Sequence, residues 1–190
     1  MRVVFVPSAP LLLLDAGPPD LRAALASALA SLTGDTVVVG AAPAPGWWTG
    51  TVDLTPYGVP GEPAADPLPL ALAVGAHLAP SARLWGVPSG ELPAASSYLV
   101  VGDGTAKRTL KAPGHLDERA EGFDARVAAA LAAGDPAALG ALDAQLAGDL
   151  WVGGLAAWGG AATLAGPWEA ELLYADAPYG VGYLVATWTR

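Results

Sequence analysis

The chain has 190 residues, the length of one domain with room for a sizeable core. Hydrophobic residues make up 53% and charged residues 14%, which excludes a disordered chain. The net charge of −9, with no basic stripe, argues against nucleic acid and anionic membrane surfaces as partners. Cysteine is absent, which excludes disulfides and thiolate metal sites and fits a cytoplasmic protein. No apolar run reaches the roughly 18 residues of a membrane span.

Short, apolar, β-branched runs along the chain predict buried strands. The first run, Arg2–Val6, ends at Pro7, and we expect a strand of the protein here rather than a cleaved signal segment. Six runs are expected to enter one sheet: Arg2–Val6, Thr36–Val39, Arg83–Val87, Tyr98–Val101, Glu171–Tyr174 and Tyr183–Trp188.

Apolar residues spaced three and four apart predict helices between these strands. Pro18-Pro19-Asp20 predicts a helix start with Asp20 as a candidate N-cap, and Gly34 predicts the end of that helix. Further helices are expected over Leu68–Leu78, over Asp117–Ala133, from Asp135-Pro136 through Leu150, and over Trp151–Leu164.

The segment 41–69 is rich in proline and glycine, which predicts a loop with one edge strand. For the pair Trp47-Trp48 we favour one ring facing the core and the other covering loop surface, with an exposed recognition patch as the alternative. His77 is interpreted as an end-of-helix residue and His115 as a solvated loop residue, rather than as metal ligands.

Strands and helices alternate for most of the chain, and a pair of strands closes it. This order predicts a single domain over residues 1–190, an α/β three-layer α/β/α fold with a central, mostly parallel, mixed sheet. In such sheets, sites form where strands end in polar loops. The stretch Leu99–Asp124 has this form, because an apolar run breaks at Gly102-Asp103-Gly104 and a polar loop then leads to a helix.

Common catalytic motifs are missing from the sequence. There is no Gly-x-Gly-x-x-Gly phosphate loop, and the carboxylate of Asp103 would repel phosphate. There is no Gly-x-Ser-x-Gly nucleophile elbow. The two histidines, His77 and His115, lie in contexts that give no pairing on a helix as metal ligands.

Three blocks of the sequence together resemble one known family. The first is Val-Pro-Ser-Ala-Pro-Leu-Leu-Leu at 6–13. The second combines Gly-Asp-Gly-Thr at 102–105, Ala-Pro-Gly at 112–114 and Glu-Gly-Phe-Asp at 121–124. The third is Ala-Pro-Tyr-Gly-Val-Gly-Tyr-Leu-Val-Ala at 177–186. In this order the blocks resemble the LigB superfamily, which comprises the class III extradiol ring-cleavage dioxygenases and their relatives, over nearly the whole chain.

The resemblance implies an Fe(II) site of two histidines and one carboxylate, with a further histidine as acid/base. At the matching positions this chain has Ser8, no histidine in the run 62–68, Ala106 in place of the acid/base, and Asp176 with a one-residue shift. We therefore expect the family's scaffold without its iron cofactor, any other metal or ring cleavage.

The candidate pocket from this comparison consists of Ser8, Asp103, Thr105, Lys107 and Asp176. Ser8, Asp103, Thr105 and Asp176 are expected to converge at one end of the sheet. For Asp103 a structural role, capping the turn that follows it, stays open beside the functional one.

Three functions remain open at this point. The first is a metal-free domain that binds a small molecule or a protein partner. The second is an enzyme of altered chemistry, a hydrolase or a dioxygenase rebuilt around Asp176, His77 and His115. The third is a structural or oligomer-forming protein with a vestigial pocket. The sequence leaves the oligomeric state, including a homo-oligomer, undecided.

Overall fold

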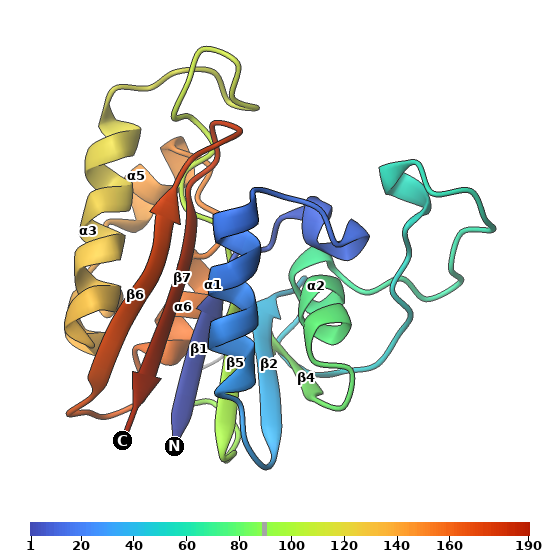
Figure 1. The fold of residues 1–190 in the computed structure, drawn as a ribbon, viewed down its shortest axis with the longest axis horizontal. Coiled ribbons are helices and arrows are strands. Elements are labelled where there is room, and N and C mark those ends of the chain that lie inside the picture. Colours follow the sequence, from blue (N-terminus) through green and yellow to red (C-terminus); the bar gives the residue numbers. More distant parts are fainter. Residues whose placement is uncertain (89–90) are drawn as a thin grey trace.

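The computed structural model describes residues 1–88 and 91–190, and within them seven strands form one sheet in the order β3-β4-β2-β5-β1-β7-β6 (Figure 1). The strands are β1 (Arg2–Val6), β2 (Thr36–Ala41), β3 (Gly46–Trp48), β4 (Arg83–Val87), β5 (Ser97–Val101), β6 (Glu169–Asp176) and β7 (Tyr183–Thr189). The central strands β4, β2, β5 and β1 run parallel, and β3, β7 and β6 are antiparallel to their neighbours. The mixed, mostly parallel sheet is confirmed, and each of the six predicted runs lies in it.

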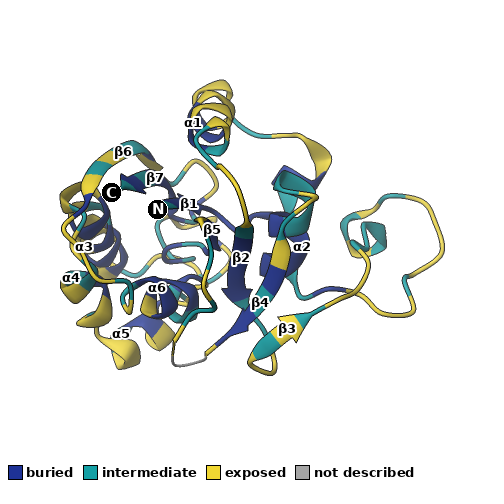
Figure 2. Ribbon diagram, turned by 90° about the horizontal axis from the view of Figure 1, so that it is seen from below, coloured by how far each residue is buried: buried dark blue, intermediate teal, exposed yellow. Residues whose placement is uncertain are grey.

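Helices cover both faces of the sheet. One face carries the 3₁₀-helix η1 (Pro10–Leu14), α1 (Pro19–Ala30) and α2 (Leu70–Leu78). The other carries α3 (Arg119–Ala133), α4 (Pro136–Gly140), α5 (Ala144–Asp149) and α6 (Leu155–Ala161), as Figure 2 shows. This is the three-layer α/β/α arrangement that the order of elements predicted.

Two apolar cores, one on each face of the sheet, explain why the central strands are continuous apolar runs. In β1, Val3 and Phe5 pack toward α3 and α6, and Val4 and Val6 pack toward α1 and α2. All four side chains are at most 1% exposed. A strand buried on both faces has no position left for a polar residue, so its polar groups collect where it ends. No helix of the described residues is both long and apolar enough to cross a membrane.

Several expected helix boundaries needed correction: α1 ends at Ala30 before Gly34, and α2 and α3 each begin two residues later than expected. The helix expected from Asp135-Pro136 through Leu150 is two short helices, because Asp143 caps a second start by accepting a hydrogen bond from Leu146 N at 3.0 Å. The helix expected from Trp151 begins only at Leu155. At the start of α1 the N-cap is Pro18 rather than Asp20, which lies in the first turn.

The edge strand expected in segment 41–69 is β3, which pairs antiparallel with β4, and Thr51 makes one isolated bridge to Pro67. Trp47 is 51% exposed and lies edge-to-face on Trp85, 4.9 Å between ring centroids. Trp48 is half-buried against the α2 side of the core. Trp48 therefore faces the core as expected, whereas Trp47 is exposed and covers Trp85 of β4 rather than loop surface. The chain that follows β3, up to α2, extends away from the sheet (Figures 1 and 2).

Candidate functional site

The loops that follow β1 and β5 bring Ser8 and Asp103 into direct contact. The Ser8 backbone N–H donates to Asp103 Oδ1 at 2.8 Å, and the Ser8 hydroxyl donates to Oδ2 at 2.8 Å. The contact continues the parallel register of the two strands, in which Val6 lies beside Val101. The carboxyl ends of adjacent parallel strands thus place the two polar side chains at one edge of the sheet, as the topology predicted.

Asp103 is half-buried, and its burial raises the pKa of its carboxyl to about 6, against the opposing effect of the two hydrogen bonds from Ser8. Both donors come from a neutral residue, and no lysine, arginine or histidine in residues 1–88 and 91–190 forms a salt bridge with this carboxylate. Asp103 titrates closer to neutrality than an ordinary aspartate.

A pair of glycines before α6 closes over this contact. Gly154 N–H donates to the backbone carbonyl of Asp103 at 2.7 Å. A Cβ at Gly153 would lie 3.6 Å from Asp103 Cβ and 3.8 Å from Ser8 Oγ, and a Cβ at Gly102 would lie only 2.3 Å from Gly154 Cα. The close approach of the backbones is possible because these residues lack side chains.

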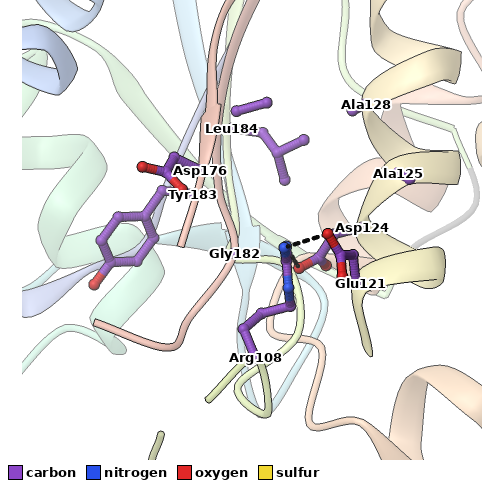
Figure 3. A pocket seen from close by; sticks show the side chains of 10 residues that line it. Arg108, Glu121, Asp124, Ala125, Ala128, Asp176, Gly182, Tyr183 and Leu184 are labelled. Atoms are coloured by element: carbon purple, nitrogen blue, oxygen red, sulfur yellow. Dashed lines mark hydrogen bonds and ion pairs between the residues drawn. The ribbon is translucent and has the colours of Figure 1, made fainter. Parts of the chain in front are cut away.

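Thr105 belongs to a second group, centred on Asp124 of α3, whose contact with Arg108 is drawn in Figure 3. Its backbone N–H and hydroxyl donate to Asp124 Oδ1 and Oδ2 at 2.8 and 2.9 Å, and Arg108 Nη1 donates to Oδ2 at 3.1 Å. Burial raises the pKa of Asp124, and the hydrogen bonds from Thr105 and Arg108 oppose that effect. A Cβ at Gly182 would meet Asp124 Oδ2 at 2.4 Å, so the carboxylate fills the space that this glycine leaves.

A pocket of about 190 Å³ lies beside this second group. Its lining includes the charged side chains of Arg108, Glu121 and Asp124, and also Asp176, whose side chain points to the other side of the hairpin (Figure 3). Arg108 Nη2 lies 3.6 Å from Glu121 Oε1. Among the described lining residues Arg108 is therefore paired with Glu121 and Asp124, and it forms no salt bridge with Asp176.

Asp176 ends β6 directly opposite Tyr183, the first residue of β7. It is exposed, and it accepts a hydrogen bond from the neighbouring Ala177 N–H at 2.7 Å. Continuing the β1–β7 register beyond its last pair, Phe5 and Ala186, puts Tyr183 opposite Ser8. Asp103, Ser8, Tyr183 and Asp176 thus follow one another across four adjacent strands.

Lys107 lies apart from the other candidates. Its Nζ is 5.3 Å from the centroid of the Trp151 ring, which is 57% exposed. The backbone of Trp151 is left-handed, with φ 57°, so the chain cannot continue α5 through this residue. The next helix, α6, begins only at Leu155.

The structure therefore divides the five predicted residues. It joins Ser8 to Asp103, brings Asp176 into the same row of strand ends, ties Thr105 to α3 and directs Lys107 to Trp151. The turn-capping role considered for Asp103 is not what its carboxylate does, since that group accepts from Ser8 across the sheet edge.

Neither histidine joins these groups. His77 is in the last turn of α2, and its Nε2 lies 3.2 Å from Asp15 Oδ1. His115 Nδ1 lies 2.9 Å from the carbonyl oxygen of Leu110. Within residues 1–88 and 91–190, no three side chains of histidine, cysteine, aspartate or glutamate lie together so as to hold a metal ion.

Sequence reasoning missed Asp124, Arg108 and Tyr183 as parts of the site region. For Asp124 a signal existed, because it falls on the buried stripe of α3 beside Phe123 and Val127. A carboxylate on the apolar side of a helix indicates a buried polar partner. Neither a protein-family model nor a curated protein matches this chain.

Proposed function

We propose that this protein binds a small molecule at the edge of the sheet formed by the carboxyl ends of β5 and β1 and the amino end of β7, without iron-dependent ring cleavage. The observation that carries the proposal is the Ser8–Asp103 pair. It holds a half-buried carboxylate, with no compensating cation, at the ends of two adjacent parallel strands. Open α/β sheets collect their ligand-binding groups at this edge.

The residues at the positions of the family's metal ligands do not fit an iron centre. Ser8 uses its hydroxyl proton to bond Asp103, and Ala106 offers only a methyl group. Asp176 supplies a single exposed carboxylate. A 2-His-1-carboxylate site needs imidazoles that these positions lack. The proposal keeps the resemblance to the LigB superfamily as one of scaffold, and a cytoplasmic location, which the absence of cysteine supports.

The first test is a thermal-shift screen of a metabolite library with the wild type and with Asp103→Asn. A ligand of this site raises the melting temperature of the wild type, and the shift is lost in Asp103→Asn. If every ligand found stabilises both proteins equally, the ligand does not bind at Asp103 and the proposed site is rejected. If none is found and the protein assembles into a stable oligomer, a structural role replaces the proposal.

The second test addresses the iron chemistry directly. After anaerobic incubation with Fe(II) and removal of free metal, we expect neither stoichiometric iron nor turnover of catechol. Ring cleavage that disappears in His77→Ala or His115→Ala would contradict the proposal and favour a rebuilt dioxygenase site.

A second candidate function is acid–base catalysis by Asp103, such as a hydrolase reaction. The pKa of about 6 favours it, because a general acid or base acts best when its pKa lies near the working pH. A panel of activated esters tests it: hydrolysis should show an inflection near pH 6 that Asp103→Asn removes. A rate that does not differ between the two proteins at any pH rejects this candidate.

A further inference from the structure

One face of the β6–β7 hairpin carries a group of phenols and carboxylates. Tyr174 and Asp176 are two residues apart on β6, and Tyr183 lies opposite Asp176 on β7. Because side chains alternate along a strand, these three share a face, the one toward α1. In Figure 3 the side chains of Asp176 and Tyr183 point to the same side, away from Leu184. The connecting loop adds Tyr179, whose ring centroid is 6.4 Å from that of Tyr183.

The hydroxyls of the two strand tyrosines have no hydrogen-bond partner among the described residues, although the rings are buried. Tyr174 is 9% exposed and Tyr183 is 4% exposed. By contrast, Tyr98 is 2% exposed, and its hydroxyl donates to the carbonyl oxygen of Pro93 at 2.8 Å. Among the described residues neither hydroxyl is a buried polar atom without a partner, so both phenol oxygens reach the surface of the hairpin. Unlike the hydroxyl of Tyr98, they are therefore open to a hydrogen bond with a ligand.

Carboxylates raise the pKa values of these phenols, whereas Arg108, which lines the neighbouring pocket with Asp176 and Tyr183, is paired with Glu121 and Asp124. Burial raises the pKa of Tyr183, and the nearby charge of Asp103 adds to that effect. Burial is also the main reason that the pKa of Tyr174 is raised, and the charges of Asp176 and Asp20 raise it further. No lysine, arginine or histidine of the described residues forms a salt bridge with any of these three aspartates. Both phenols stay neutral, and the carboxylates around them lack a counter-cation.

We propose that this tyrosine cluster, consisting of Tyr174, Tyr179 and Tyr183 with Asp176, binds a small organic ammonium ion. Carboxylate and phenol oxygens accept hydrogen bonds from N–H groups, and tyrosine rings attract a cation over their faces. The net charge of −9 raises the local concentration of cations. This inference rests on the proposed function, since it names the class of ligand for the same edge of the sheet.

The probes are choline, methylammonium and 3,3-dimethylbutan-1-ol, the last a neutral molecule with the shape of choline. Binding is followed by NMR chemical shifts of the amides of β6 and β7. Choline, methylammonium or both should shift residues of the hairpin, and the neutral alcohol should not. Equal shifts from the alcohol, or no saturable shift from either cation, would overturn the proposal.

Variants then separate this site from general attraction to an acidic protein. Asp176→Asn should weaken ammonium binding about tenfold, the effect of losing a charged hydrogen-bond partner. Tyr179→Ala should weaken it about two- to fivefold, the contribution of one exposed cation–π contact. Tyr183→Phe keeps the ring, removes the hydroxyl and should also weaken binding.

Glu169→Gln is the matched control, since it removes the same charge from the opposite end of β6. It should leave binding within about twofold, whereas a loss equal to that of Asp176→Asn would show non-specific attraction and overturn the site. The two proposals can fail separately. A neutral or anionic ligand that requires Asp103, with no ammonium bound, would leave the proposed function standing and reject this inference.

Discussion

Asp103 and Asp124 lie at the same end of the sheet, yet their carboxylates differ in burial and in the charge of their hydrogen-bond donors. Asp124 is buried and receives two donors from Thr105 and one from the guanidinium of Arg108. Asp103 is half-buried and receives two donors from Ser8, neither of them charged. The first carboxylate has its charge compensated, and the second has not.

The difference separates a structural carboxylate from one available for a ligand. Asp124 ties the loop after β5 to α3, and the space left by Gly182 is filled by its oxygens. Asp103 retains an uncompensated charge beside solvent and a pKa of about 6, and perturbed groups of this kind concentrate at functional sites.

The largest effect is expected at Gly182. In Gly182→Ala the new Cβ would meet Asp124 Oδ2 at 2.4 Å, and three hydrogen bonds hold that carboxylate in place. We expect the free energy of unfolding to fall by about 3 kcal/mol in denaturant titrations. Gly122→Ala is the control, because nothing lies within 4 Å of its Cβ and alanine favours the helix. Equal losses in both variants would show that the fit around Asp124 is not what matters.

Thr105→Val keeps the shape of the side chain and removes one donor to the buried Asp124. Loss of a hydrogen bond to a buried carboxylate should lower the free energy of unfolding by about 2 kcal/mol. The measurement is urea denaturation at neutral pH. A change below about 0.5 kcal/mol would mean that this hydrogen bond does not help to hold the loop.

The stability of the protein should carry a pH dependence that originates at Asp103. Its pKa is about 6 in the folded chain and about 3.9 when unfolded, so between these values the folded state holds a proton that the unfolded state has lost. Asp103 therefore lowers the free energy of unfolding as pH rises from about 4 to 6, by about 1–2 kcal/mol for a half-buried group.

Asp103→Asn removes this dependence and can be compared with the wild type at the two ends of that range. The stability of the variant relative to the wild type should increase from the acidic to the neutral end. A difference that stays constant over the range would place the pKa of Asp103 near its ordinary value.

Ser8→Ala should have the smallest effect. It removes the hydroxyl donor, but the backbone N–H of residue 8 still bonds Oδ1. We expect a loss below about 1 kcal/mol and a pKa of Asp103 above 6, since the Ser8 hydroxyl lowers it. A carboxyl ¹³C titration measures the pKa, and a fall in its value would contradict this description.

The fold was predictable because buried parallel strands are apolar runs that polar loops interrupt. The strands Arg2–Val6 and Tyr98–Val101 could be recognised from composition alone. Because they are parallel neighbours, the residues just after them, Ser8 and Asp103, could be expected to lie together. Helix boundaries were harder, since Asp143 caps a new start in a stretch whose leucine spacing favours one helix.

The rest of the site could not be predicted because it depends on which face a side chain takes after a strand ends. Thr105 follows Asp103 by two residues yet turns to α3, and Lys107 turns to Trp151. No periodicity in a loop encodes these directions. The orientation of Tyr183 beside Asp176 depends on the register of the β6–β7 hairpin, which contains a bulge that the sequence does not mark.

The central claim is that Asp103 is available for a ligand and Asp124 is structural. The most direct test measures the free energy of unfolding of Asp103→Asn and Asp124→Asn side by side at neutral pH. Asp103→Asn should match or exceed the wild type, because it removes an uncompensated charge, and Asp124→Asn should lose about 3 kcal/mol, because it leaves Arg108 without its buried partner. Equal losses in the two variants, or a larger loss in Asp103→Asn, would contradict the account.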